Sequence, residues 1–187
     1  MDDVANSDRE LFCVLRAQSG SHDALNELLT ILQAPLYRYI RNLVKEPSQA
    51  EDILQEVFIR IYRKLKWLRE PSALRPWAYQ IATRESFRYL NRSKRWSHEV
   101  TDEELLNSLS YEAPDTTFPS DLVEQLPTLV EKLSPGSRAV IALYYLHEFS
   151  LSETAAVLEI PIGTVKSRLA YGLARLRAEV KDLVRSE

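Results

Sequence analysis

The sequence predicts an all-α protein made of two small helical domains. Apolar residues recur at three- and four-residue steps through most of the chain, and no convincing β-type alternation stands out. Between residues 97 and 121 this periodicity fades into a segment with two prolines and many acids. At 187 residues the chain suits two domains of modest size. We therefore expect domains at residues 1–96 and 122–187, joined by a flexible acidic linker at 97–121.

The first domain is expected to contain four helices. They should cover residues 8–17, 22–44, 47–68 and 74–92. Pro35 should bend or divide the second helix, because proline has no backbone N–H to donate. Ser48 and Glu51 have the spacing of a capping box, which predicts the start of the third helix. Glu70, Pro71 and Ser72 are expected to form a loop before the fourth.

The second domain is expected to end in a helix-turn-helix. Helices at 122–133 and 134–147 should come first, the latter with Ser134 as its cap and Pro135 in its first turn. Ser150 and Glu153 have capping-box spacing, and Pro161 should end that third helix and begin the fourth. Six apolar residues recur along the fourth helix and should form its buried stripe: Ile162, Val165, Leu169, Leu173, Leu176 and Val180.

The outer face of this last helix is polar and basic, which makes DNA the expected partner. In a helix-turn-helix the second helix lies in the major groove, and its N-terminal residues reach the base edges. Between residues 162 and 178 every charged side chain is basic, which suits a helix lying against phosphates. The alternative is an ordinary amphipathic helix with a solvated basic face. The residues expected to face DNA are Thr164, Lys166, Ser167, Arg168, Tyr171 and Arg175.

The formal net charge of −3 conceals two opposite blocks. Residues 60–96 contain 11 basic and 2 acidic residues, a net charge of +9, whereas residues 97–131 contain 9 acids and no Lys or Arg. The basic block indicates a surface for nucleic acid. Solubility and disorder are the favoured interpretation of the acidic block. A second hypothesis is that it folds back and masks the basic surface in the free protein.

Nothing in the sequence indicates an enzyme, and we expect no catalytic residues, no metal and no cofactor. The four glycines are too scattered for a phosphate-binding loop, and the three histidines have no Cys or His partner at ligand spacing. Cys13 lies in an apolar run and should be a small buried hydrophobe, which fits a reducing cytoplasm. The longest apolar run, residues 139–146, is too short for membrane insertion, and the N-terminus lacks the apolar core of a signal peptide.

Two further patches stand on predicted helices of the first domain. Asp52, Gln55 and Glu56 lie at i, i+3 and i+4, and on these residues alone a solvated helix face is the favoured interpretation. Arg84, Arg88 and Arg92 are spaced by four, so they should form a basic ridge along one helix.

In these segments the sequence resembles the bacterial sigma factors of the extracytoplasmic-function (ECF) group, in their two-domain form. The resemblance is carried by ordered motifs that span nearly the whole chain: EDILQEVFIRIYR at 51–63, PWAYQIATRESFRYL at 76–90, LSPGSRAV at 133–140 and IPIGTVKSRL at 160–169. It implies that the first domain, sigma region 2, binds core RNA polymerase and melts the −10 promoter element. It implies that the second, sigma region 4, recognises the −35 element. A stress or envelope response and an anti-sigma factor as a further partner are also implied.

The resemblance assigns roles to residues of the first domain. Core polymerase should be contacted by Asp52, Gln55, Glu56 and Phe58. The −10 element should be contacted by Lys66, Trp67, Arg75, Arg84, Arg88 and Arg92. Melted bases are held by aromatic stacking beside basic side chains, and the candidates are Trp67, Trp77, Tyr79, Phe87, Tyr89 and Trp96. We expect Trp77, Ile81 and Tyr89 to be buried instead, and the loop 66–75 to form the pocket for a flipped base.

One departure from the family pattern concerns Arg84 and Arg88. Many relatives carry Asn and Asp, or a second Asn, at these positions on the promoter-facing helix. Amide side chains recognise adenine edges, whereas arginine prefers guanine or phosphate, so specificity at the −10 element is open. Two rival functions therefore remain: a freestanding helix-turn-helix regulator that binds operator DNA as a dimer, and a polymerase-binding protein that has lost promoter recognition.

Overall fold

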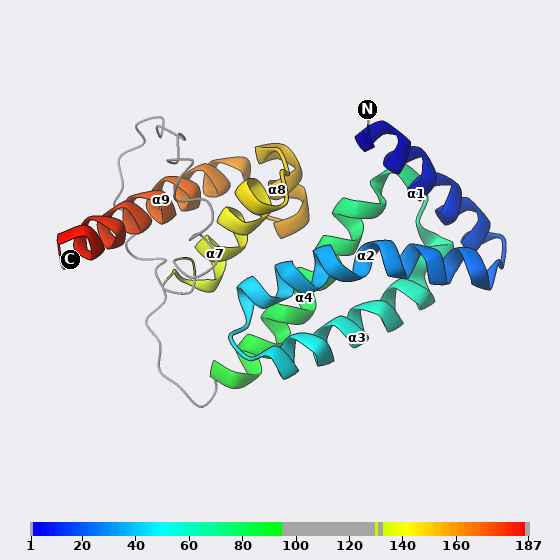
Figure 1. Ribbon diagram of the computed structural model, residues 1–187, viewed down its shortest axis with the longest axis horizontal. Helices are drawn as coiled ribbons and strands as arrows, with labels where there is room; N and C mark the ends of the chain where they lie inside the picture. Colours follow the sequence, from blue (N-terminus) through cyan, green and yellow to red (C-terminus); the bar gives the residue numbers. More distant parts are fainter. Residues whose placement is uncertain (1, 95–129, 131–132, 186–187) are drawn as a thin grey trace. The chain divides into compact units, whose positions relative to one another are not determined.

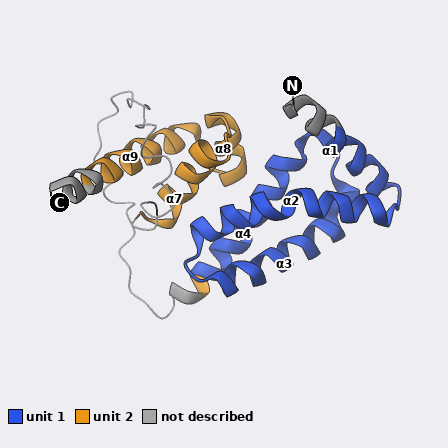
Figure 2. Cartoon of the chain, in the orientation of Figure 1, with its two compact units in different colours: residues 1–90 blue, residues 91–187 orange. Residues whose placement is uncertain are grey.

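The computed structural model describes residues 2–94, 130 and 133–185, which fall into two compact units at 1–90 and 91–187 (Figure 1, Figure 2). Every regular element in these described ranges is helical, so the predicted all-α class is confirmed. The predicted linker at 97–121 lies outside the described residues. So does most of the predicted helix at 122–133, and the domain limits drawn from the sequence stay a prediction.

Unit 1 contains the helices α1 (Asp2–Gln18), α2 (His22–Leu43), α3 (Pro47–Lys64) and α4 (Leu74–Lys94). Helix α2 packs against both α1 and α3 (Figure 1). It runs unbroken through Pro35, so the expected division of this helix is wrong. The buried face on either side of Pro35, which includes Leu32 and Leu36, stabilises the helix enough to offset the missing backbone hydrogen bond.

The start of α3 differs from the prediction. Glu46 precedes the helix, Pro47 occupies its first turn, and no side chain caps it, so Ser48 is not the cap. Proline at this position has a φ angle already suited to a helix, which moves the start ahead of Ser48. At the other end α3 stops at Lys64, and the 3₁₀ turn η1 (Leu65–Trp67) follows. A second 3₁₀ turn, η2 (Pro71–Ala73), lies where a loop was expected.

A buried hydrogen-bond chain joins α2 to α4 within the core of unit 1. The Thr83 hydroxyl donates to the Tyr79 carbonyl at 2.8 Å and lies 2.8 Å from the Tyr39 hydroxyl. Because a threonine hydroxyl has one proton, Tyr39 must be the donor to Thr83. The rings of Tyr39 and Tyr79 also pack at 5.2 Å between centroids. Burial raises the pKa of both tyrosines above the ordinary value, which keeps both hydroxyls neutral.

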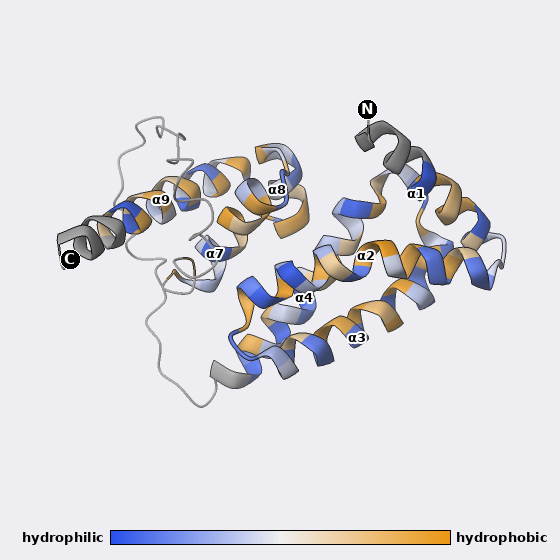
Figure 3. Cartoon of the chain, viewed as in Figure 1, coloured by the Kyte–Doolittle hydropathy of each residue, from blue (hydrophilic) through white to orange (hydrophobic). Residues whose placement is uncertain are grey.

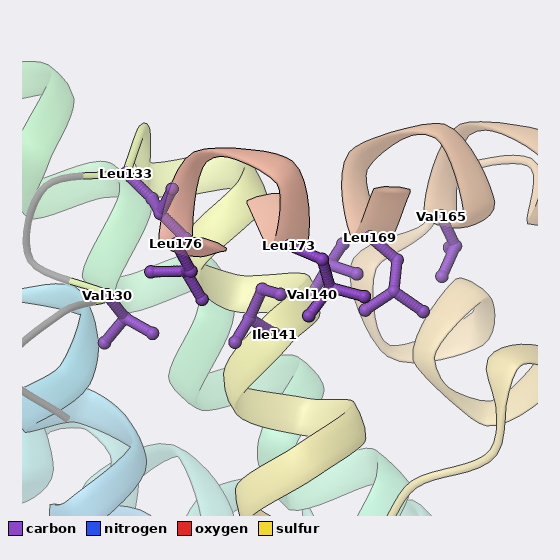
Figure 4. Packing of buried hydrophobic residues seen from close by; sticks show 8 residues of the cluster. All are labelled: Val130, Leu133, Val140, Ile141, Val165, Leu169, Leu173 and Leu176. Carbon is purple, nitrogen blue, oxygen red and sulfur yellow. The ribbon is translucent and has the colours of Figure 1, made fainter. Parts of the chain in front are cut away.

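Unit 2 contains α7 (Pro135–Ile141), the π-helix η5 (Ala142–Leu146), α8 (Leu151–Leu158) and α9 (Ile162–Arg185). Ser134 caps α7 by accepting a hydrogen bond from the Ser137 amide, as predicted. Eight buried residues form the apolar core that holds these helices together (Figure 4), namely Val130, Leu133, Val140, Ile141, Val165, Leu169, Leu173 and Leu176. A Cβ on Gly172 would stand 3.1 Å from the Ile141 side chain, so this glycine permits the close approach of α9 to α7.

The predicted buried stripe of α9 is confirmed at its centre and wrong at its start. Val165, Leu169, Leu173 and Leu176 are buried, whereas Ile162 is 46 % exposed. Ile162 is the first residue of α9, ahead of the turn that packs on the core, so its side chain gains little cover. The side chain of Val180 lies outside the described part of the structure. Figure 3 shows the resulting pattern, in which hydrophobic and hydrophilic residues alternate along the helices of each unit.

We expect Tyr39→Phe to lower the free energy of unfolding by about 1 kcal/mol, because it removes one buried hydrogen bond and leaves Thr83 without its donor. Tyr62→Phe on α3 is the control, since Tyr62 is 59 % exposed and should change stability little. Urea unfolding of the full chain, followed by circular dichroism, measures both. Equal stability of the two variants would contradict the role given to the buried chain.

Candidate nucleic-acid interface

The N-terminus of α8 is closed by the predicted capping box. The Glu153 amide donates to the Ser150 hydroxyl oxygen at 3.2 Å, and the Ser150 amide donates to a Glu153 carboxylate oxygen at 2.8 Å. The Ser150 hydroxyl also donates to this carboxylate at 2.6 Å. These hydrogen bonds from Ser150 lower the pKa of Glu153. The box therefore fixes the residue at which the first helix of the motif begins.

A left-handed residue makes the turn between α8 and α9. Glu159 has φ 56° and ψ 40°, and both its amide and that of Ile160 donate to the Ala155 carbonyl, the latter at 3.2 Å. This satisfies carbonyl groups that the helix end leaves open. The Val165 amide then donates to the Pro161 carbonyl at 3.1 Å, so the chain enters α9 at once. The helix-turn-helix expected from the sequence is present, with α9 as its second helix.

The residues predicted to face DNA lie on the outer side of α9. Thr164, Lys166, Ser167, Arg168 and Tyr171 are half-buried and Arg175 is exposed. The Ser167 hydroxyl donates to the Gly163 carbonyl at 3.0 Å within the helix. This set is held in place because the opposite side of α9 is buried in the core of unit 2.

Arg168 differs from the others because its side chain rests on α7. A Cβ on Gly136 would stand 3.0 Å from the Arg168 Cζ atom, so the guanidinium group lies against the first turn of α7. A larger residue at position 136 would require the Arg168 side chain to shift. The Arg168 side chain thus extends from α9 across to the start of α7.

The patch predicted on α3 is exposed at its first two residues. Asp52 and Gln55 are exposed, whereas Glu56 and Phe58 are half-buried. Glu56 forms an i,i+4 ion pair with Arg60 at 2.9 Å. The patch is therefore accessible, and its third member is already partnered within α3.

The basic ridge on α4 is tied to a buried carboxylate. Glu85 is 7 % exposed and lies between two arginines, at 2.8 Å from Arg60 on α3 and 2.7 Å from Arg88 on α4. A carboxylate buried in this way needs such partners, because an isolated buried charge is costly. Arg84 and Arg92 are exposed on the same helix. Arg88 thus has a structural role in addition to the predicted one.

The aromatic candidates separate by exposure. Trp67 is 77 % exposed, and Phe87 is half-buried. Tyr79 is 4 % exposed, so its prediction as a stacking residue is wrong; its position beside Tyr39 places it in the core. Of the three residues expected inside, Ile81 is buried, whereas Trp77 and Tyr89 are only half-buried. Trp96 lies outside the described residues.

Helix α1 supplies contacts that the sequence analysis did not anticipate. The Glu10 carboxylate, 7 % exposed, binds Arg75 at 2.7–3.1 Å through two guanidinium nitrogens. The Gln18 side-chain amide donates to the carbonyls of Leu65 and Leu68 at 2.9 and 2.8 Å. These pairs are separated by 47 to 65 residues, so no local pattern signals them. Cys13, on the same helix, is buried as predicted, and burial raises the pKa of its thiol.

In the described ranges no group of three or more His, Cys, Asp or Glu side chains gathers in a way that could hold a metal ion. Among the described helices none combines the length and the apolar character needed to cross a membrane.

Comparison with known proteins matches both units. The Sigma-70 region 2 family matches residues 28–96, and the Sigma-70, region 4 family matches residues 129–178. The ECF RNA polymerase sigma factor SigW of Bacillus subtilis is 31 % identical over 179 residues, which cover 91 % of this chain and 96 % of SigW. The chain belongs to the ECF RNA polymerase sigma factors. The ECF RNA polymerase sigma-E factor of Escherichia coli K12 is 28 % identical over 182 residues, or 92 % of this chain and 94 % of that protein.

Two solved structures share the fold of this sigma factor. CnrH, in complex with the cytosolic domain of CnrY, has a TM-score of 0.67 at 21 % identity and covers 93 % of this chain and 98 % of its own. The sigma factor RpoE of Bartonella quintana, in complex with the anti-sigma factor NepR, has a TM-score of 0.64 at 24 % identity, with coverages of 86 % and 98 %. Sigma factors bind core RNA polymerase and direct transcription from specific promoters. The family therefore favours this function over that of a freestanding operator-binding regulator.

We expect Ser150→Ala to destabilise unit 2 of this sigma factor by about 1 kcal/mol at neutral pH, the usual cost of losing a helix cap. Ser152→Ala is the control: it removes a hydroxyl that lies 3.0 Å from the Ser150 hydroxyl but keeps the hydrogen bonds between Ser150 and Glu153. The pKa of Glu153 is lower in the folded chain than its ordinary value of 4.5. Stability from the capping box should thus be present above pH 4.5 and lost as the pH falls through the folded pKa.

Urea unfolding at neutral pH and near pH 3 measures this difference. The gap between wild type and Ser150→Ala should narrow in acid, because a protonated Glu153 no longer accepts both hydrogen bonds. A gap that is independent of pH would show that the carboxylate contributes nothing to the cap.

Proposed function

We propose that this sigma factor holds core RNA polymerase and the −10 element with its first domain, residues 1–96, and the −35 element with its second, residues 122–187. The linker at 97–121 would connect the two sites on one promoter. The observation that carries the proposal is the polar and basic outer face of α9 in a complete helix-turn-helix. Its capping box, left-handed turn and buried stripe together fix which residues face outward.

At the −35 element, Thr164, Lys166 and Ser167 are placed to reach base edges, because they lie in the first two turns of α9. Tyr171 and Arg175 lie farther along and suit the DNA backbone. Arg168 extends toward α7 and is assigned a phosphate, since a guanidinium group directed to the side of the recognition helix suits an oxygen of the DNA backbone.

At the −10 element, the proposed contacts are Lys66 and Trp67 from the connection between α3 and α4, and Arg75, Arg84, Arg88 and Arg92 from α4. The loop 66–75 is the proposed pocket for a flipped base. Its support is the exposure of Trp67, which leaves an indole face open for stacking beside Lys66 and Arg69.

Core polymerase is the proposed partner of the α3 patch, which comprises Asp52, Gln55, Glu56 and Phe58. The support is the exposure of the first two polar residues beside a half-buried aromatic side chain. Aromatic residues near an interface centre with polar neighbours at its rim are typical of protein contacts.

Regulation by an anti-sigma factor is proposed on the example of the similar B. quintana RpoE, whose structure contains NepR. We place the protein in the cytoplasm, where core polymerase is found. Sigma factors are not enzymes in general, and that this chain catalyses no reaction of its own stays a prediction. A role in a stress or envelope response is likewise part of the proposal.

The proposal is tested by incubating the purified chain with core polymerase and genomic DNA, then sequencing the 5′ ends of the transcripts. Initiation should occur at a set of promoters that share two elements at a fixed spacing. Tight binding of the chain alone to operator-like DNA as a dimer, without initiation, would favour the regulator. Polymerase binding without initiation would favour a protein that has lost promoter recognition.

We expect Arg168→Ala to weaken initiation about equally on all −35 variants, because a phosphate contact is lost. The slope of the logarithm of the promoter-binding constant against the logarithm of salt concentration should become shallower by about one. Arg177→Ala, half a turn away around α9, is the control. Run-off transcription and filter binding over a salt series measure the effects. A selective loss at one −35 base pair, of about 1–3 kcal/mol, would instead assign Arg168 to a base edge.

We expect Asp52→Ala to weaken binding of core polymerase by at least about fivefold, because its exposed carboxylate is assigned to the interface. Glu51→Ala is the matched control, since Glu51 is exposed on the same helix but points about 100° away around its axis. Competition with a labelled wild-type chain for limiting core polymerase measures both. Loss of the same size in both variants would count against a specific contact at Asp52.

A further inference from the structure

The connection between α3 and α4 runs alongside α1, and both of its ends are attached to that helix (Figure 1). At its start, Gln18 binds the carbonyls of Leu65 and Leu68. At its end, Glu10 binds Arg75 in the first turn of α4. Gln18 and Glu10 are eight residues apart, so the two attachments lie about 12 Å apart along the axis of α1.

Gln18 is suited to fix one turn of backbone. Both oxygens that face its amide nitrogen are carbonyl acceptors, so each of its two N–H groups is used. The Leu65 carbonyl also accepts from the Leu68 amide at 3.0 Å, which closes the 3₁₀ turn. The two carbonyls held by Gln18 flank Trp67 in the sequence. The backbone that carries the exposed indole is therefore tethered on both sides.

The exposure of the segment supports a role beyond packing. Its anchors, Leu65 and Leu74, are 3 % and 2 % exposed, whereas Trp67 between them is 77 % exposed. A large aromatic ring in water on a fixed backbone gains nothing for stability from that rigidity. It does lower the cost of ordering when a flat partner stacks on the ring. An unpaired base is such a partner.

We propose that α1 is the template for the base-binding loop, and that Gln18 is a positioning residue that presents Trp67 to an unpaired base of the −10 element. The inference rests on the proposed role of the loop 66–75. It assigns a function in promoter opening to a helix that precedes the matched Sigma-70 region 2 segment, residues 28–96. Gln18 acts on the base only through the backbone of η1.

The test uses the holoenzyme on a promoter found by transcript sequencing, with a series of templates that carry one abasic site in the non-template strand of the −10 element. In the wild type, the base held by Trp67 is the position where the abasic site slows open-complex formation most. At that position, open-complex formation on the intact template should be about five- to 150-fold faster than on the abasic template, the range expected for one stacked base. This quotient is called the base-to-abasic ratio below. Trp67→Ala should bring this ratio close to one.

Gln18→Met keeps the length of the side chain and removes its donors, and Gln18→Glu places a carboxylate against two carbonyls. Both should reduce the ratio at the Trp67 position at least about threefold, with Glu the stronger, while the ratios at other −10 positions stay as in the wild type. Thr30→Ala is the matched control. It removes a side-chain hydrogen bond to the Asn26 carbonyl in α2, away from the loop, and should leave every ratio unchanged.

The outcomes separate the inference from the function it rests on. If Trp67→Ala brings the ratio close to one and both Gln18 variants keep the wild-type ratio, the proposed base pocket is supported and the positioning role of Gln18 is overturned. If the Gln18 variants slow all templates equally, Gln18 serves stability alone, which also overturns the proposal. If Trp67→Ala leaves the wild-type ratio intact, the loop is not the pocket, and both proposals fail.

Discussion

The burial of one face of each long helix is the constraint on which both candidate surfaces depend. A helix that buries Val165, Leu169 and Leu173 can turn only its opposite side to a partner. The side chains proposed to contact DNA are thereby selected by residues buried in the core of unit 2. The capping box at Ser150 sets where α8 begins, and the left-handed Glu159 ends α8 and directs the chain into α9. The direction in which the outer face of α9 points thus rests on packing and on local hydrogen bonds at the turn.

In unit 1 the equivalent constraint is electrostatic. Glu10 and Glu85 are both 7 % exposed. Arg75 holds Glu10, and Arg60 and Arg88 hold Glu85, although charge counting alone would assign all three arginines to nucleic acid. Pairing inside the protein reduces the charge that the basic block can offer to phosphates. It also fixes the direction of those arginines, since a bidentate or bridging guanidinium has little freedom to rotate. Part of the +9 block is therefore engaged in ion pairs although Arg75 and Arg88 stay exposed, and other members, including Lys66, Arg69 and Arg92, are exposed as well.

How far the sequence could predict the structure depended on the range of the interaction. The cap at Ser134, the capping box at Ser150 and the centre of the α9 stripe are local, and residue spacing was enough to predict them. The prediction of Ser48 as the cap was wrong because Pro47, which favours a first helical turn, sets the start of α3 ahead of the residue that the capping-box spacing indicated. Tyr79 and the α1 contacts could not be predicted, because their partners lie tens of residues away and become neighbours only when the helices pack.

The unusual arginine at position 88 has a structural reason in this chain. Arg88 is ion-paired to Glu85, one turn earlier on α4, and Arg60 reaches the same carboxylate from α3. An amide side chain at position 88 would leave the buried Glu85 with one cation in place of two, at the cost that attends a poorly compensated buried charge. Arginine there serves the junction of α3 and α4, so its presence is no sign that promoter recognition has been lost. In the proposed function, specificity at the −10 element therefore rests more on the connection between α3 and α4, where Trp67 is 77 % exposed.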